Sequence, residues 1–249
     1  MKARAVGVIS ASFVGAGAVV AGQAIYAARR RDLPTVSGAD ASGSEGDPSH
    51  PIIRVAAAGD STLTGPGLTD PADVWLRQAL RTLASTQQRR FELQSFAVGG
   101  TRMSDLLRDQ LDALISVRPD VAVVVVGTND AIRFTPLDEV SEACARLVGR
   151  VAAEIPHVVI AGVGDLANIA RLRWPLAGAL RFRGRAVDGI IRHIAAQHDN
   201  VHYVDVSLAD ADFRRGGAAL FAADLFHPNR HGHALWAAVS RAALEDALA

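Results

Sequence analysis

The chain has 249 residues and a formal net charge of zero, which allows one domain with a core large enough to fold without disulfide or metal staples. Its single cysteine, Cys144, excludes an intramolecular disulfide, and its only lysine, Lys2, excludes a P-loop, a Schiff-base lysine and a Ser–Lys dyad in a folded domain. Residues 1–31 carry five basic and no acidic groups, which leaves 21 basic and 26 acidic groups elsewhere, so we expect no nucleic-acid partner.

The first expected element is Ala5–Ala28, a stretch of 24 residues without a charge. At about 1.5 Å per helical residue it is long enough to cross a hydrocarbon layer of roughly 30 Å. We expect residues 1–31 to be an uncleaved membrane anchor, and a cleavable signal peptide or a buried core helix are the alternatives. Small residues around Gln23 favour cleavage, whereas the length of the stretch and the arginines Arg29–Arg31 favour an anchor. Basic residues on both sides leave the orientation open.

Residues 32–50 read DLPTVSGADASGSEGDPSH and are rich in Gly, Ser, Asp and Pro. This composition predicts a flexible linker. The remaining residues, 51–249, are then expected to form one domain.

From residue 51 onward, short apolar runs alternate with longer amphipathic ones, which is typical of strands joined by helices. We expect five strands, at Ile52–Ala58, Phe91–Val98, Val121–Val126, His157–Val163 and Val201–Val206. The expected helices are Ala72–Ser85, Met103–Val117, Asp138–Glu154, Leu176–His198 and Gly232–Leu248. The unbroken valines Val123–Val126 indicate a strand covered on both faces, as in a parallel sheet. The pattern predicts an α/β protein, a three-layer α/β/α sandwich with a five-stranded, mainly parallel sheet.

Four short polar motifs follow these strands. Gly59-Asp60-Ser61 comes after the first strand, Gly99-Gly100 after the second and Gly127-Thr128-Asn129-Asp130 after the third. Asp224-Leu225-Phe226-His227 lies between the fifth strand and the last helix. Because ligands of open α/β sheets bind beyond the carboxyl ends of the strands, we expect all four motifs at one edge.

The motifs contain the groups that acyl transfer from an ester requires. Ser61 would be the nucleophile, His227 its general base, and Asp224 would orient the imidazole. Gly100, whose N–H no side chain obstructs, and the Asn129 amide are candidate oxyanion donors. Each motif alone also has a structural explanation as a turn, a helix cap or a buried Asp–His pair. Their convergence favours a catalytic site.

Together the motifs resemble those of the SGNH, or GDSL-type, hydrolase superfamily, over essentially all of residues 52–248. The resemblance implies a flavodoxin-like fold with a catalytic triad of Ser61, Asp224 and His227. It also implies an oxyanion hole formed by the Ser61 N–H, the Gly100 N–H and the Asn129 side chain.

The run Phe96–Gly99 departs from the superfamily pattern. It lacks the asparagine that many members carry there, and with it a supporting hydrogen bond. We expect no cofactor and no metal.

Several other polar residues are candidates for a lesser role. His231 and His233 are near the site in sequence and could contact substrate. Asp210 and Asp212 are typical of a solvated loop rather than of a metal site. The arginine-rich stretch Arg171–Arg185 either lines the substrate cleft or simply begins a helix with solvated arginines.

The sequence therefore predicts a serine ester hydrolase, similar to carboxylesterases and lipases, that acts through an acyl-enzyme. Two rivals stay open: an acyltransferase to a sugar or lipid alcohol, and a membrane-tethered binding module without turnover. A dinucleotide site is disfavoured because Gly59–Gly67 lacks a G-x-G-x-x-G pattern. We expect a small-molecule, lipid or glycan ester as substrate and a membrane contact through residues 5–28. The protein would be membrane-anchored or secreted, with its catalytic domain outside the cytoplasm.

Overall fold

A mostly parallel sheet forms the centre of the computed structural model, which describes residues 22–23 and 40–248. Its strands are β1 (Gly43–Glu45), β2 (Ile52–Gly59), β3 (Arg90–Ser95), β4 (Val121–Val125), β5 (His157–Ala161) and β6 (Val201–Val204). They are ordered β1-β3-β2-β4-β5-β6, and every neighbouring pair is parallel except β1 with β3.

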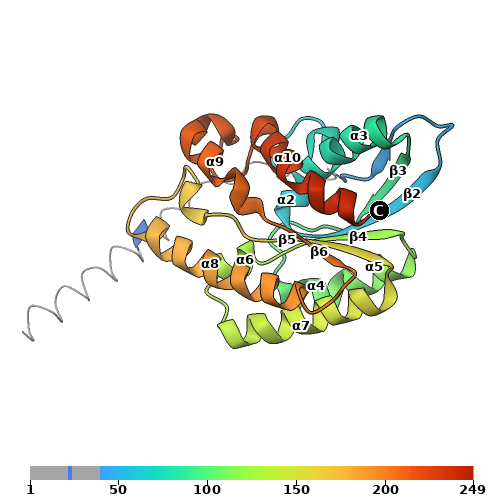
Figure 1. Ribbon diagram of the computed structural model, residues 1–249. Helices are drawn as coiled ribbons and strands as arrows, with labels where there is room; N and C mark the ends of the chain where they lie inside the picture. The colour runs from blue at the N-terminus through green and yellow to red at the C-terminus, as the bar shows by residue number, and fades with distance from the viewer. Residues whose placement is uncertain (1–21, 24–39, 249) are drawn as a thin grey trace, which may run out of the picture.

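Helices cover both faces of this sheet (Figure 1). They are α2 (Ser61–Thr64), α3 (Trp75–Gln87), α4 (Met103–Asp109), α5 (Leu111–Ser116), α6 (Thr128–Ile132), α7 (Leu137–Glu154), α8 (Leu176–Ala195), α9 (Asp210–Gly216) and α10 (Arg230–Asp246). Helices α3 and α10 pack on one face, and α4, α5, α7 and α8 pack on the other. The predicted three-layer α/β/α architecture is confirmed.

Strand β4 is buried on both faces, as its valines predict. Val123 and Val125 face the core cluster that contains the residues of α3 and α10. Ala122 and Val124 face the opposite cluster, which contains the residues of α4, α7 and α8. The alternation follows from the two-residue period of a strand, so one apolar run serves two cores.

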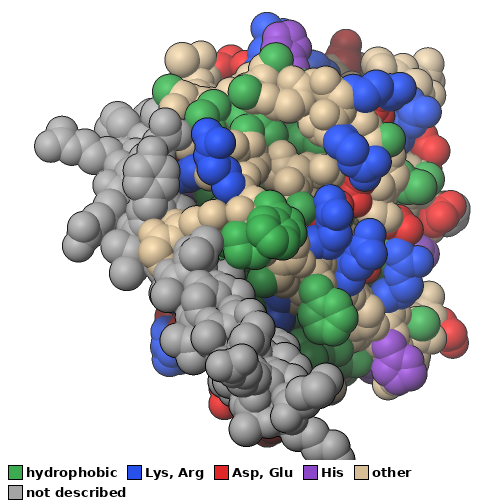
Figure 2. All heavy atoms as spheres, turned by 90° about the vertical axis from the view of Figure 1, so that its left-hand side faces the viewer, with side chains coloured by type: hydrophobic (Ala, Val, Ile, Leu, Met, Phe, Trp, Pro, Cys, Tyr) green, Lys and Arg blue, Asp and Glu red, His purple; other side chains and the backbone are tan. Residues whose placement is uncertain are grey.

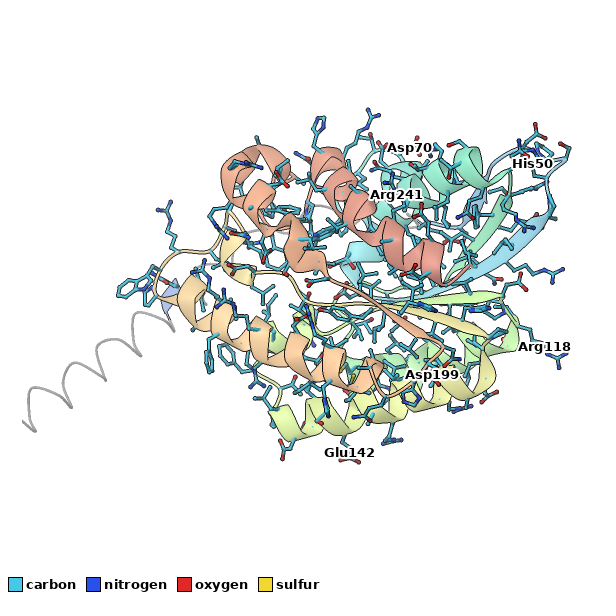
Figure 3. The ribbon with its side chains drawn as sticks, viewed as in Figure 1. His50, Asp70, Arg118, Glu142, Asp199 and Arg241 are labelled. Atoms are coloured by element: carbon cyan, nitrogen blue, oxygen red, sulfur yellow. The ribbon has the colours of Figure 1, made fainter. Side chains whose placement is uncertain are left out.

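The parallel strands run in one direction across the molecule and define its two edges. His50, just before β2, and Arg118, just before β4, both lie at the right-hand side of Figure 3. The right-hand side is therefore the amino edge of the sheet, and the strands end toward the left. The motifs that follow β2, β3 and β4 thus lie at the left-hand, carboxyl edge.

The sheet has six strands rather than the predicted five, because β1 comes from the segment expected to be a flexible linker. It pairs antiparallel with β3, and Ala41, just before it, is buried. Glu45 is also buried and accepts hydrogen bonds from Arg77 Nε at 2.7 Å and Arg81 Nε at 2.9 Å. The linker prediction is thus wrong for residues 40–50, where these ion pairs and the edge pairing fix the chain. Residues 32–39 lie outside the described part.

The expected helix 103–117 is interrupted at Gln110, which separates α4 from α5. The other predicted long helices are present with ends shifted by a few residues. The sequence analysis did not predict the short helices α2, α6 and α9.

Of the predicted anchor Ala5–Ala28, only Gly22 and Gln23 belong to the described residues. Within those residues, no helix has both the length and the apolar character needed to cross a bilayer.

Candidate active site

The Gly59-Asp60-Ser61 motif forms the turn from β2 into α2, and Ser61 is the first residue of that helix. Gly59 has φ +156°, and a Cβ at this position would collide with the carbonyl oxygen of Val125 on β4. Only glycine allows the two strands to approach so closely here. Asp60 caps α2 by accepting a hydrogen bond from Thr62 N at 2.9 Å. The turn therefore holds Ser61 at the carboxyl edge of the sheet.

The Asp224–His227 motif forms a tight loop in which the first residue is hydrogen-bonded to the last. The Asp224 carboxylate accepts hydrogen bonds from Phe226 N at 2.9 Å and from His227 N at 3.0 Å. Its second oxygen lies 2.6 Å from His227 Nδ1. Leu225 adopts φ +58°, which allows the chain to fold back over three residues.

Asp224 is ionised in this loop. Burial acts to raise the pKa of its carboxyl, but the hydrogen bonds from the His227 ring and from two backbone N–H groups outweigh burial and lower the pKa. An ionised carboxylate only accepts hydrogen bonds, so Nδ1 carries the proton. The other ring nitrogen, Nε2, is then an acceptor, which is the tautomer that a general base needs.

Ser61 and His227 line the same cavity. The structure thus brings together two residues that are far apart in sequence. Among the hydrogen bonds of residues 40–248, none joins the Ser61 hydroxyl to the His227 ring.

The cavity has a volume of about 100 Å³ and enters the layer between the sheet and helices α3 and α10. Its apolar lining includes Trp75, Val125, Phe213, Phe221, Phe226 and Trp236. Ser61, Thr62, Thr128 and His227 supply polar groups at the cavity. An apolar pocket with a few polar groups is the usual form of a small-molecule site.

One candidate oxyanion donor, Gly100, lies in the connection after β3, and the other, Asn129, lies in the first turn of α6. Gly100 has φ +81°, and a Cβ there would lie 3.4 Å from the Arg133 guanidinium. The Asn129 side-chain amide donates to Thr101 O at 3.1 Å and to Asp60 Oδ2 at 3.2 Å. Asn129 thus links its own motif to the Gly59-Asp60-Ser61 motif and to Thr101, the residue after Gly100. Neither Gly100 nor Asn129 lines the apolar cavity.

A family match covers the segment that contains all four motifs. The sequence profile of the GDSL-like lipase/acylhydrolase family matches residues 57–235. The chain belongs to this family. A GDSL-like esterase of Mycobacterium tuberculosis is 28% identical over 198 residues, which are 79% of this chain and 63% of that protein. The chain therefore spans less than two thirds of the length of this curated relative.

Solved structures share the fold of this GDSL-family chain. LAE5, an α/β hydrolase from the metagenome of Lake Arreo in Spain, has a TM-score of 0.64 at 22% identity and covers 80% of this chain and 97% of its own. The acetylxylan esterase Axe2 of Geobacillus stearothermophilus has a TM-score of 0.60 at 19% identity and covers 78% and 95%. These likenesses confirm the predicted SGNH hydrolase fold.

Two buried residues of the GDSL-family chain hold the motifs in place, and the sequence analysis missed both roles. Gln110 accepts a hydrogen bond from Gly59 N at 2.8 Å and donates to Gly59 O at 3.1 Å and to the Thr101 hydroxyl at 2.9 Å. Asp130 accepts a hydrogen bond from Met103 N at 3.0 Å. The signal for Gln110 was present, because it occupies a core-facing position among the leucines of the expected helix.

The two remaining histidine candidates do not line the cavity. His233 is fully buried, accepts a hydrogen bond from Trp75 N at 3.2 Å and stacks edge-on against Trp236. Burial lowers its pKa to about 3, so this ring is neutral and structural. His231 lies on the first turn of α10, outside the cavity lining.

The structure also shows where Asp210, Asp212 and residues 171–185 lie relative to the cavity. Asp210 lines the cavity and accepts a hydrogen bond from Asp165 N at 3.0 Å, whereas Asp212 pairs with Arg215. In the part of the chain that the structure describes, no three His, Cys, Asp or Glu side chains are grouped as metal ligands would be. Residues 171–185 are absent from the cavity lining and lead into α8. Arg173 and Arg185 are exposed, as the second interpretation expects, whereas Arg171 is buried.

Proposed function

We propose that this chain is a serine esterase that hydrolyses short-chain acyl esters through an acyl-enzyme. The observation that carries the proposal is that Ser61 and His227 line one apolar cavity while Asp224 holds the far side of the His227 ring at 2.6 Å. The family to which the chain belongs and its esterase relatives support the same reaction class.

In the proposed reaction, His227 Nε2 takes the proton of the Ser61 hydroxyl as its oxygen attacks the ester carbonyl. Asp224 keeps the imidazole in the required tautomer and stabilises the imidazolium that forms. The imidazolium then protonates the departing alcohol, which leaves Ser61 acylated. Water, activated by the same ring, releases the acid and restores the hydroxyl.

The negative charge that develops on the carbonyl oxygen is held by the Ser61 N–H, the Gly100 N–H and the Asn129 amide. Asn129 reaches this role by giving up one of its two hydrogen bonds, to Asp60 or to Thr101 O, when substrate binds. Both bonds, at 3.2 and 3.1 Å, lie at the long end of the ordinary range of N–H···O distances. The loss of one such donor typically costs about 10²–10³ in rate.

The size of the cavity sets the expected acyl group. In another protein, an engineered apolar cavity of about 150 Å³ binds benzene. A cavity of about 100 Å³ next to Ser61 therefore fits an acyl chain of acetyl to butyryl size. The acetyl group to which the name of the Geobacillus neighbour refers falls in this range.

We also propose that residues 5–28 attach the chain to a membrane and that the catalytic domain lies outside the cytoplasm. The uncharged 24-residue stretch supports the attachment to a membrane. Its basic residues lie on both flanks and do not set the orientation. Fractionation of cells, followed by protease treatment of intact cells, would test both parts.

The esterase proposal is tested by Ser61→Ala in the full chain, with p-nitrophenyl esters of two to eight carbons. The wild type should favour two to four carbons, and the variant should lose activity on every ester while its circular dichroism stays unchanged. Ser116→Ala, an exposed serine at the end of α5, is the matched control and should stay active. A Ser61→Ala protein with wild-type turnover would refute the proposal. An added alcohol that becomes acylated in place of water would show acyl transfer instead.

A further inference from the structure

Two aromatic side chains at the start of α8 are unusually exposed. Trp174 has 82% of its surface exposed and Phe182 has 77%, the two highest values among the large hydrophobic side chains of the described residues. Gly178 lies between them in sequence, four residues from each, and sits against the Trp174 indole. Trp174 lies two residues before α8 and Phe182 lies in the second turn of this helix, so both aromatic residues flank the beginning of α8.

Positive charge surrounds this aromatic pair. Residues 166–187 contain five arginines and no acidic residue. Arg181 pairs with Asp165 at 2.9 Å. Arg173 and Arg185 are exposed, and neither forms an ion pair with any residue that the structure describes. The surface around Trp174 and Phe182 is therefore both apolar and cationic.

This surface lies at the carboxyl edge of the sheet, where the site is. Figure 2 looks onto that edge and shows large hydrophobic side chains in the middle of the face, with basic side chains gathered beside them. The same connection that leads into α8 contributes Leu166, Asn168 and Ile169 to the lining of the cavity. The aromatic pair and the cavity thus share one side of the molecule.

Gln23, one of the two described residues of the uncharged N-terminal stretch, contacts the domain at the same place. Gln23 Nε2 donates to Trp174 O at 2.9 Å, and Leu176 N donates to Gln23 Oε1 at 3.3 Å. Gln23 belongs to residues 5–28, whose length and composition suit a bilayer, with basic residues on both flanks. A membrane entered by this stretch would lie next to Trp174.

We propose that the face formed by Trp174, Phe182, Arg173 and Arg185 rests on an anionic lipid surface. Aromatic rings are favoured at the level of the headgroups, where one side is apolar and the other is wet. Arginines near an anionic membrane contribute about 1 kcal/mol each. The proposal concerns docking alone and does not depend on ester hydrolysis.

The test uses the emission of Trp174, because the other two tryptophans, Trp75 and Trp236, pack within the domain. The full chain is mixed with vesicles of phosphatidylcholine and phosphatidylglycerol that contain a brominated phosphatidylcholine, which quenches tryptophan only on contact. The wild type should be quenched, and the quenching should be absent from Trp174→Phe, since that variant keeps only the two packed tryptophans.

The contribution of positive charge to the docking is tested with the double variant Arg173→Gln and Arg185→Gln. Two arginines at about 1 kcal/mol each should weaken the docking equilibrium about 30-fold on vesicles with phosphatidylglycerol, read from the quenching. The matched control is Arg118→Gln, which removes one exposed arginine at the amino edge and should leave the quenching unchanged.

Three results would overturn the proposal. The chain could fail to bind the vesicles, or it could bind them without quenching of Trp174, which would place this face away from the lipid. The third is a shift of Trp174 emission with a soluble acetylated polysaccharide but not with vesicles, which would assign the face to a glycan.

Discussion

Asp60, next to the proposed nucleophile, has a carboxyl group whose pKa is raised by burial. It is fully buried, and burial raises the pKa of its carboxyl to about 6 in spite of hydrogen bonds from Thr62 and Asn129. The raised pKa means that folding favours the neutral acid. Asp60 therefore contributes stability that is fully present below pH 3.8, the pKa of the unfolded chain, and is lost as pH rises through about 6.

The variant Asp60→Asn tests this loss of stability with rising pH, because the amide is neutral at every pH. Relative to the variant, the wild type should lose roughly 2–3 kcal/mol of unfolding free energy between pH 4 and pH 7.5. Urea unfolding at the two pH values measures the difference. Any pH-independent cost of the amide cancels in the comparison. A difference that stays constant with pH would show that Asp60 is not perturbed in this way.

The residues proposed for catalysis lie in motifs that the sequence displays, whereas the residues that support them show no such pattern. Ser61, Asp224 and His227 lie in short motifs whose residue types already fit one reaction, and the fold brings the serine and the histidine to one cavity. Gln110 and Gly59 are hydrogen-bonded although they are 51 residues apart in sequence, so no local sequence pattern predicts this contact. The hydrogen bonds of Asn129 to Asp60 and to Thr101 O likewise form only when the segments after β2, β3 and β4 come together.

Strand β1 is held to the sheet edge chiefly by one buried carboxylate. Glu45 accepts from Arg77 and from Arg81, and Arg77 also donates to Ser42 O at 3.0 Å. Arg77 is nearly buried, whereas Arg81 is half exposed, so most of the stabilisation comes from the Arg77 side.

Glu45→Ala should therefore lower the unfolding free energy by about 2–3 kcal/mol, because it leaves the Arg77 guanidinium buried without its carboxylate. The matched control is Glu92→Ala on β3, whose pair with Arg90 is partly exposed and should be worth under about 1 kcal/mol. Urea unfolding of both variants gives the comparison. Equal losses would mean that β1 is not anchored through Glu45.

The long helices and the five longer strands could be predicted from the sequence, whereas strand β1 and the short helices could not. The five predicted strands and the long helices have the apolar periods that burial imposes, so they appear with bounds shifted only by a few residues. Strand β1 has three residues and no apolar alternation, and its place depends on arginines from a distant helix. Helices α2 and α6 are single turns set by the strand ends before them.

The layered architecture of the whole molecule creates the cavity beside Ser61, which lies where the sheet, α10 and the loops around α9 meet. Ser240 on α10 lines this cavity and is buried, with its hydroxyl donating to Ala237 O at 3.1 Å. A larger side chain at this position can enter existing space rather than displace packed atoms. The cavity can therefore be shortened with little cost to the fold.

Ser240→Leu should keep hydrolysis of acetyl esters and lower kcat/KM for butyryl esters by roughly 10- to 100-fold, about the effect of the 1–3 kcal/mol that one methylene is worth in a pocket. The neighbouring Arg241→Leu introduces the same side chain on the solvent face of α10, where Figure 3 shows Arg241, and should leave chain-length preference unchanged. An equal loss on acetyl and butyryl esters would place the acyl chain elsewhere.

The central claim is that the loop of His227 makes Ser61 a nucleophile, and covalent labelling tests it most directly. The full chain is treated with a fluorophosphonate, and the modified peptide is identified by mass spectrometry. We predict a single adduct on Ser61, absent from Ser61→Ala and formed far more slowly in His227→Ala. Labelling at another residue, or a rate that does not change without His227, would contradict the account.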